Sequence, residues 1–362
     1  MSEQIALIDR ELPAPAGAAA TLDPVALLAA CDVPIVNLSG GKDGLRAAAI
    51  VMDAARAAGV VDRVYTAHAS LGPLEWPGVD VNGVHYPGVS ELAAEHSRLL
   101  GVPPERHIEV RRTRELDGVR VPYDLLTFIA ERGDWPWLGR ARFCTGDWKT
   151  KLIFGAFSAL VRRLKKQLGR PVQCLNILGI RADESRDRKN HPVLRITTDN
   201  SARVVTEWLP AHAETTQAVK DWTDAQGLPH HWAYDSAPGA GDWLGSSRCS
   251  CSLCVFANGR DLLLAGARRP RLIELFAKVE RVRGVSFNPN TSIAAVLAKS
   301  RQQGAPEPGV VIEDEGPEFD ALEAAVEAAL AKPPRRPRYQ GNATALPLET
   351  GCDGCPMDGG AR

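Results

Sequence analysis

The chain of 362 residues lacks the long hydrophobic runs and leader segments that mark membrane and secreted proteins. It has no uncharged apolar stretch of about 18 residues, which excludes a transmembrane helix. The first residues carry no basic segment followed by an apolar run, so we expect no secretory signal. Cysteine is also scarce: there are eight, and three of them cluster at Cys249, Cys251 and Cys254. This distribution favours a reducing cytoplasm and a cysteine-bearing site over a disulfide framework.

A strong net charge is absent as well, because 43 lysines and arginines balance 44 aspartates and glutamates. The charges are unevenly placed: residues 305–362 carry 11 acids and 5 bases, whereas residues 1–304 carry 33 acids and 38 bases. A mildly basic body suits an anionic small ligand such as a nucleotide. It is too weak to indicate nucleic acid as a partner on its own, since nucleic-acid-binding domains usually have a strongly basic surface.

Between residues 21 and 210, short apolar runs alternate with longer helical patterns. We expect strands at residues 34–38, 64–67, 107–110 and 172–178, and helices at residues 45–58, 91–100, 123–132 and 149–168. Strands that alternate with helices at this spacing form parallel β-α-β units with right-handed crossovers. The expected fold class is therefore α/β, with a parallel sheet flanked by helices.

The other parts of the chain differ in composition from this α/β domain. Residues 1–20 are rich in alanine and proline and are predicted to form a disordered tail. Residues 211–303 are mostly helical in pattern and contain the cysteine cluster. Residues 304–362 are expected to hold a linker, a flexible acidic tail with two cysteines, and one amphipathic helix whose apolar face is Phe319, Leu322, Val326 and Leu330.

A glycine-rich turn follows the first predicted strand and precedes the first predicted helix. Its sequence is Ser39-Gly40-Gly41-Lys42-Asp43-Gly44. Consecutive glycines let main-chain N–H groups turn toward an anion, and a helix N-terminus adds positive potential. Lys42 adds a point charge for phosphates, and Asp43 is expected to orient Lys42 or to help hold Mg²⁺. The spacing does not match a Walker A motif. The alternative is a plain turn rich in small residues.

This hexapeptide resembles the PP-loop of the adenine nucleotide α-hydrolase superfamily, whose usual form ends in serine where this chain has Gly44. Three further segments narrow the resemblance to the PAPS reductase-like branch, over about residues 33–290. They are Ala67-His68-Ala69-Ser70-Leu71-Gly72 with Glu75-Trp76-Pro77, Arg142-Phe143-Cys144-Thr145 with Lys149, and Gly179-Ile180-Arg181-Ala182-Asp183-Glu184-Ser185-Arg186. The resemblance implies a Rossmann-like (HUP-type) fold that binds ATP or an adenylyl sulfate.

The resemblance also assigns Arg181, Glu184 and Arg186 to the nucleotide site. Guanidinium groups bind phosphate or sulfate in a bidentate way. The alternative is a solvated charge run, in which these arginines pair with neighbouring carboxylates. Gly44 removes a hydroxyl that would contact phosphate, but the main-chain cradle and Lys42 remain, so nucleotide binding is still expected.

The clustered cysteines have Cys144 as their natural fourth partner. Four thiolates at one point, Cys144, Cys249, Cys251 and Cys254, suit a [4Fe–4S] cluster or a structural Zn²⁺ ion. Chance clustering without metal is the third alternative, and the resemblance favours iron–sulfur. Two tail cysteines, Cys352 and Cys355, form either a redox or sulfur-carrying pair or an idle one.

Three functions remain open at this stage. The first is an ATP-dependent sulfurtransferase, resembling DndC-type proteins that place sulfur in the DNA backbone and enzymes that thiolate tRNA. It implies ATP with Mg²⁺, a sulfur donor such as a cysteine desulfurase, and a nucleic acid as acceptor. The second is reduction of adenylyl sulfate or its 3′-phosphate to sulfite, although the tail lacks the histidine of the Glu-Cys-Gly-x-His motif of those reductases. The third is a nucleotide-binding subunit without catalysis.

Overall fold

The computed structural model describes residues 22–136, 142–288, 291–302 and 305–335. In this part of the chain, a central sheet has the strand order β5-β2-β1-β8-β10-β9. All neighbouring strands are parallel except β9, which runs antiparallel to β10. The strands are β1 (Val33–Asn37), β2 (Tyr65–Ser70), β5 (His107–Arg111), β8 (Val172–Ile177), β9 (Leu194–Asp199) and β10 (Arg203–Trp208). The predicted α/β class and the four predicted strands are confirmed.

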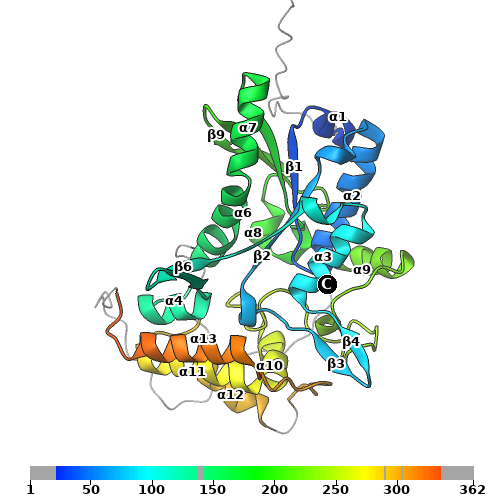
Figure 1. Ribbon diagram of the computed structural model, residues 1–362. Helices are drawn as coiled ribbons and strands as arrows, with labels where there is room; N and C mark the ends of the chain where they lie inside the picture. The colour runs from blue at the N-terminus through cyan, green and yellow to red at the C-terminus, as the bar shows by residue number, and fades with distance from the viewer. Residues whose placement is uncertain (1–21, 137–141, 289–290, 303–304, 336–362) are drawn as a thin grey trace, which may run out of the picture.

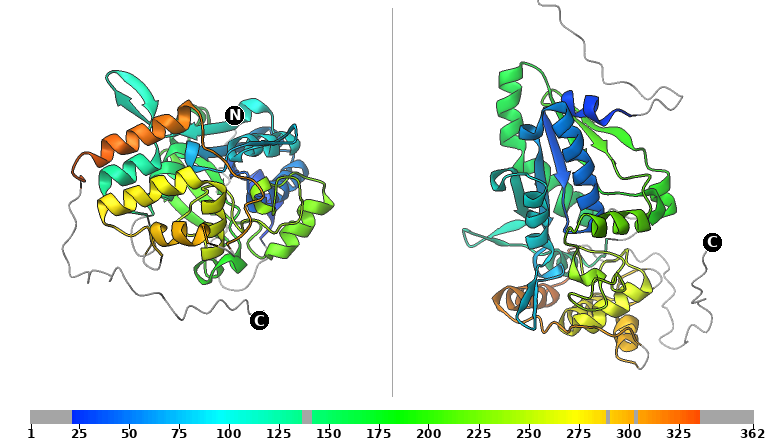
Figure 2. Two further views of the ribbon diagram at one scale, coloured as in Figure 1. Left: turned by 90° about the horizontal axis from the view of Figure 1, so that it is seen from below. Right: turned by 90° about the vertical axis from the view of Figure 1, so that its right-hand side faces the viewer.

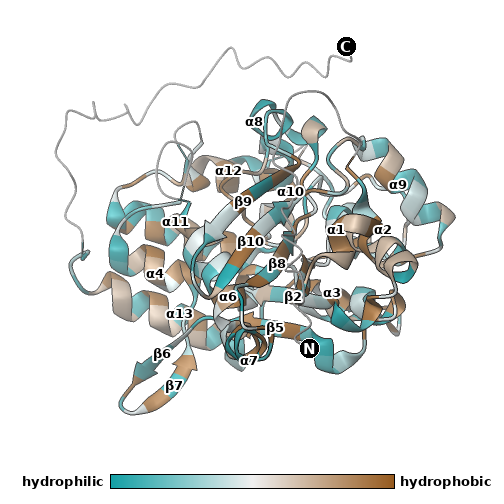
Figure 3. Ribbon diagram, turned by 90° about the horizontal axis from the view of Figure 1, so that it is seen from above, coloured by the Kyte–Doolittle hydropathy of each residue, from teal (hydrophilic) through white to brown (hydrophobic). Residues whose placement is uncertain are grey.

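Helices cover both faces of this sheet (Figure 1). One face packs against α1 (Pro24–Ala29), α2 (Lys42–Ala58) and α3 (Val89–Leu99), and the other against α6 (Lys151–Ala156) and α7 (Ser158–Leu168). The alternation of β1 explains this arrangement: Val36 packs in the core with α2, whereas Val33 and Ile35 pack in the core with α6 and α7. Figure 3 shows hydrophobic residues gathered along β8 and β10 and in α1 and α2, where the layers meet.

A third core lies in a helical layer beside the sheet, below it in Figure 1 and in the right view of Figure 2. The layer contains α4 (Leu125–Arg132), α10 (Gly259–Arg268), α11 (Pro270–Arg283), α12 (Ile293–Ser300) and α13 (Pro317–Leu330). In α13, Phe319, Leu322 and Val326 are buried, which confirms the predicted apolar face of this helix. The C-terminal region of the described chain is thus mostly helical, as expected.

The prediction of one continuous helix at residues 149–168 is wrong in detail. The chain instead forms a short α5 (Phe143–Thr145), a π-helical turn at Gly146–Thr150, and then α6 and α7, which meet at Phe157. A π-turn inserts an extra residue into the helical ladder and is frequent at functional sites. This turn contains Lys149, which lies beside the cysteines described below.

Strands β9 and β10 and two hairpins were not predicted from the sequence. Edge strand β9 is mostly exposed and alternates polar with apolar residues, so it lacks the apolar run that reveals a buried strand. The hairpins join β3 (Val79–Val81) to β4 (Val84–Tyr86) and β6 (Thr113–Leu116) to β7 (Val119–Pro122). They turn at Asn82-Gly83 and Asp117-Gly118, where both residues have positive φ, as tight hairpins require.

No helix in the described part of the chain is long and apolar enough to cross a membrane. The predicted disordered tail at residues 1–20 and the cysteine pair Cys352 and Cys355 lie outside the described residues. Part of the predicted linker is described, and within it Asp314 is buried in an ion pair with Arg269 of α11's N-cap position. The main-chain N–H of Ile312 also donates to the carbonyl of Arg268, so this segment is anchored to the helical layer.

Candidate functional site

The glycine-rich turn joins the carboxyl end of β1 to the first turn of α2, as the sequence predicted. Gly40 has a φ of +65°, and a Cβ there would lie 2.7 Å from the carbonyl oxygen of Val89, so only glycine fits. Helix α2 begins at Lys42, and its N-cap residue, Gly41, provides no side-chain hydrogen bond. The N-cap residue therefore leaves the first main-chain N–H groups of α2 without a side-chain cap of its own, and such a helix N-terminus suits an anion.

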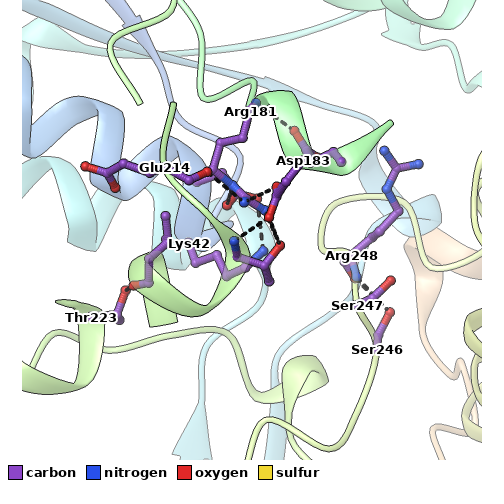
Figure 4. Close-up of polar contacts among 12 residues, drawn as sticks. Lys42, Arg181, Asp183, Glu214, Thr223, Ser246, Ser247 and Arg248 are labelled. Carbon is purple, nitrogen blue, oxygen red and sulfur yellow. Dashed lines mark hydrogen bonds and ion pairs between the residues drawn. The ribbon is translucent and has the colours of Figure 1, made fainter. Parts of the chain in front are cut away.

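Lys42 is held in place by a carboxylate from its own helix. Its ammonium is buried, and Nζ lies 3.0 Å from Asp43 Oδ2. The other carboxylate oxygen of Asp43 accepts a hydrogen bond of 2.7 Å from Nε of Arg181. Figure 4 shows the side chains of Lys42, Arg181 and Asp183 directed toward one another. Asp43 thus orients Lys42, which is one of the two roles expected for it.

Arg181 and Arg186 occupy different environments although they share one motif. Arg181 is fully buried, and its guanidinium also donates to Asp183 Oδ1 at 2.5 Å and to Thr216 Oγ1 at 2.9 Å. Arg186 is exposed, and its side chain has no ion pair or hydrogen bond within the described residues. Arg181 therefore organises the site, and Arg186 has a guanidinium free for an anion.

Glu184 completes the turn that follows β8. Its Oε2 accepts a hydrogen bond of 2.9 Å from the main-chain N–H of Arg181, and it forms an ion pair with Arg188. Gly179 precedes this turn and lies against the start of α2: a Cβ there would be 2.5 Å from main-chain atoms of Asp43 and Gly44. The PP-loop-like turn and the Gly-Ile-Arg motif therefore pack main chain to main chain.

The loop after β2 pairs with the cysteine segment. Glu75 forms an isolated antiparallel bridge with Cys251, and the N–H of Trp76 donates to the carbonyl of Ser250 at 3.1 Å. The N–H of Ser252 donates to the carbonyl of Leu74 at 2.9 Å. Two motifs that are far apart in the sequence are thus held side by side by main-chain hydrogen bonds.

Lys149 lies among the cysteines. It donates a hydrogen bond of 3.0 Å to Ser250 Oγ. Burial acts to lower the pKa of Lys149, yet its interactions with Cys251, Glu75, Cys254 and Cys144 leave that pKa above its usual value. Three of the four predicted ligand thiols, those of Cys144, Cys251 and Cys254, therefore interact with the same buried ammonium group.

The fourth thiol, Cys249, lies on the side of the cysteine segment that faces the PP-loop-like turn. A Cβ on Gly41 would be 3.8 Å from Cys249 Cβ. Ser250, between Cys249 and Cys251, has a φ of +110°, a strained value for serine. Burial raises the pKa of both flanking thiols. The cysteine segment therefore lies next to the glycine-rich turn.

In the described residues, no group of three or more histidine, cysteine, aspartate or glutamate side chains is arranged to hold a metal ion. The donor set nevertheless matches a metal cluster in kind, because four thiols from two distant segments lie around a lysine that offsets negative charge. The ligand assignment of Cys144, Cys249, Cys251 and Cys254 stays a prediction. Cys31 and Cys174 lie buried in the cores on the two faces of the sheet.

A buried ion pair connects the two halves of the site, and its residues, His68 and Glu75, belong to a predicted motif in which neither was assigned an individual role. His68 Nε2 lies 3.2 Å from Glu75 Oε2, and His68 Nδ1 lies 2.9 Å from the carbonyl oxygen of Leu38. Burial disfavours both charges, but their mutual attraction raises the pKa of His68 and lowers that of Glu75. Ser250 Oγ lies 3.3 Å from Glu75 Oε1, so the pair links the end of β1 to the cysteine segment.

Adjacent arginines tie the site to the helical layer. Arg269 donates to the carbonyl of Glu75 at 2.7 Å and to Ser252 Oγ at 2.8 Å, and it forms a buried ion pair with Asp314. Arg268 donates to the carbonyls of Ala233 and Asp235 at 3.0 and 2.6 Å. The helical layer therefore positions both the cysteine segment and the loop around residue 234.

Neither a family model nor a curated protein matches this chain. Among solved structures, it is similar to phosphoadenylyl-sulfate (PAPS) reductase from Candida auris in a phosphate complex, with 15% sequence identity and a TM-score of 0.30. The match covers 58% of this chain and 83% of that chain. At this level of similarity the comparison assigns no residue and no activity, and the fold rests on the sheet order given above.

Proposed function

We propose that this protein is a PP-loop ATP pyrophosphatase that activates an acceptor for sulfur transfer. An acceptor oxygen attacks the α-phosphate of ATP, pyrophosphate leaves, and a sulfur nucleophile then displaces AMP from the adenylylated acceptor. The observation that carries this proposal is the proximity of two sites: a helix N-terminus with a fixed lysine lies beside Cys249 of the cysteine cluster. A nucleotide and a sulfur-bearing group could therefore meet there.

The proposed roles of the loop residues follow from their contacts. Main-chain N–H groups at the start of α2 and the ammonium of Lys42 would stabilise the charge that develops on the leaving pyrophosphate. Asp43 is engaged by two cations, Lys42 and Arg181, so we assign it to orientation and expect Mg²⁺ to bind through the phosphate oxygens. Arg186, with no partner in the described residues, is the guanidinium that would bind a phosphate oxygen.

The cysteines would hold the cofactor of the second step. Cys144, Cys249, Cys251 and Cys254 are the residues that would bind a [4Fe–4S] cluster, which when bound supplies a soft iron centre for sulfur and electrons. Lys149 would offset the negative charge of the thiolates, since it is buried among them. The proposal includes a sulfur donor such as a cysteine desulfurase, a nucleic acid as acceptor, and action in the cytoplasm.

Product analysis tests this function against sulfate reduction. The protein, purified without oxygen, is incubated with ATP, Mg²⁺ and either DNA or tRNA, and pyrophosphate is measured. In parallel it is incubated with adenylyl sulfate or its 3′-phosphate and a dithiol reductant, and sulfite is measured. We expect pyrophosphate from ATP, lost in Lys42→Ala, and no sulfite. Sulfite without pyrophosphate would replace the proposal with a reductase.

A further inference from the structure

A tyrosine from a distant part of the chain lies over the nucleotide loop. Tyr234, in the 3₁₀ turn Trp232–Tyr234, is buried, and its hydroxyl oxygen would lie 3.1 Å from a Cβ on Gly41. The ammonium of Lys42 lies 5.1 Å from the centre of the tyrosine ring. The phenol therefore lies at the mouth of the anion cradle, and Cys249 Cβ lies near the same Gly41 position, 3.8 Å from its Cβ site.

The surrounding loop holds this tyrosine in place. The main-chain N–H of Gly245 donates to the carbonyl of Tyr234 at 2.6 Å, and Arg268 donates to the carbonyls on both sides of it. The ring of Tyr234 lies 5.5 Å from that of Trp243, which stacks on His230 with ring centres 3.9 Å apart. An aromatic residue fixed on both its main chain and its ring can present its hydroxyl without a large loss of conformational entropy.

The hydroxyl of Tyr234 is suited to donate a hydrogen bond. Its oxygen accepts a hydrogen bond from the main-chain N–H of Lys42, and its own O–H remains available to donate to a ligand in the cradle. The loop itself lacks a hydroxyl at Gly44, where a Cβ would lie 3.2 Å from the carbonyl oxygen of Asn37.

We propose that Tyr234 is a phosphate-binding residue of this site, whose hydroxyl donates to an oxygen of the ATP polyphosphate and supplies the contact that Gly44 cannot make. This inference rests on the proposed nucleotide-binding function and extends it to a residue outside the four sequence motifs. A hydrogen bond to a charged group corresponds to about a 10- to 100-fold difference in affinity.

Calorimetric titration of the full chain with ATP and with AMP tests the proposal, using Tyr234→Phe. We expect the Kd for ATP to rise about 10- to 100-fold and the Kd for AMP to stay unchanged, since AMP lacks the β- and γ-phosphates. Tyr123→Phe is the matched control, because Tyr123 donates its hydroxyl to Glu131, away from the loop, and this variant should bind ATP as the unaltered protein does.

Three results would overturn the proposal. An unchanged Kd for ATP means that the hydroxyl does not touch phosphate. Tighter ATP binding means that the hydroxyl competes with phosphate for the cradle. Equal weakening of ATP and AMP means that the change acts through the fold or the base. Failure of the nucleotide site itself is distinguishable, because Lys42→Ala would then leave ATP binding unaltered.

Discussion

The two halves of the site are built in different ways. The glycine-rich loop that we propose binds the nucleotide is six consecutive residues, and its shape follows from local features: a glycine with positive φ at Gly40 and a helix that starts at Lys42. The cysteine half is assembled from separate segments, which contribute Cys144, Lys149 and the stretch from residue 249 to residue 254, and it is anchored by Arg269. A contiguous motif carries its geometry in its own sequence, whereas an assembled one depends on the whole fold.

This comparison predicts different responses to mutation. Changes in the nucleotide loop should alter ligand affinity and leave the fold intact. Changes in the residues that anchor the cysteine half should disturb the cysteine cluster although these residues lie outside it, because they hold together segments that are distant in the sequence.

The largest expected effect is loss of metal from the cysteine half. Cys144→Ser should lose as much iron as Cys251→Ser after anaerobic reconstitution, because a site of four thiolates fails when any ligand is removed. Iron analysis and the visible spectrum measure this. Cys174→Ser is the control, since Cys174 is buried against the sheet and should retain full iron. Full iron in Cys144→Ser would mean that the fourth ligand comes from elsewhere, with Cys352 or Cys355 next in line.

The next effect concerns the anchor. Asp314→Asn removes the charge that partners Arg269 in a buried pair, and breaking such a pair costs about 3–5 kcal/mol in the free energy of unfolding. Urea unfolding measures this loss. Glu274→Gln provides the contrast, because Glu274 and Arg301 form an exposed pair worth about 0–1 kcal/mol. Equal losses for the two variants would show that residues 305–316 do not anchor the site.

A smaller loss of stability is expected at acidic pH, and it comes from two buried histidines beside the loop that carries Tyr234. Burial lowers the pKa of His96 to about 4 and of His231 to about 3. Both histidines stay neutral in the fold but gain a proton when unfolded below about pH 6.5, so stability is full above that pH and falls as pH decreases. Between pH 6.5 and 5.5 these two histidines together should lower the free energy of unfolding by about 2 kcal/mol, and His68, whose pKa is raised in the fold, acts in the opposite direction.

Unfolding experiments across this pH range, with the double variant His96→Asn, His231→Asn as comparison, check that prediction. The variant should show a much flatter dependence on pH. An equally steep dependence would place the acid-sensitive groups elsewhere.

The smallest effect is expected at Gly44, which does not have positive φ, so that serine is compatible with the main chain. Gly44→Ser should tighten ATP binding by about 10-fold at most, because a new hydrogen bond to phosphate is partly offset by a Cβ only 3.2 Å from the carbonyl oxygen of Asn37. Calorimetric titration with ATP measures this change. Gly40→Ser, at a φ of +65°, should instead abolish binding. Weaker binding by Gly44→Ser would point to a loop specialised for a different ligand.

The sequence predicted the parts of the fold that are marked by local patterns. Strands β1, β2 and β8 are mostly buried, β5 alternates apolar with polar residues, and the helix through Phe319, Leu322 and Val326 has a clear apolar face. Strand β9 at the sheet edge was not predicted, because a strand that is exposed on both faces has no apolar run in its sequence. The helix expected at residues 149–168 begins in a π-turn at Gly146–Thr150 and breaks at Phe157, and periodicity reveals neither feature.

The candidate site also has parts that could be predicted from the sequence and parts that could not. The loop from Ser39 to Gly44 was predicted because its residues are consecutive, and the grouping of Cys144 with the later cysteines came from a resemblance to a family. The contact of Tyr234 with the loop and the pair of Arg269 with Asp314 have no signal in the sequence, because each depends on the approach of segments that are far apart.

The most direct test of the account is calorimetric titration of Lys42→Ala with ATP and Mg²⁺. Alanine keeps the helix, and Asp43 retains its bond to Arg181, so the melting temperature should change little. Lys166→Ala, an exposed lysine on α7, is the control for loss of one positive charge. The account predicts that Lys42→Ala binds ATP about 100-fold more weakly and that the control variant binds ATP as tightly as the unaltered protein. An unchanged affinity for ATP in a folded Lys42→Ala protein would contradict it.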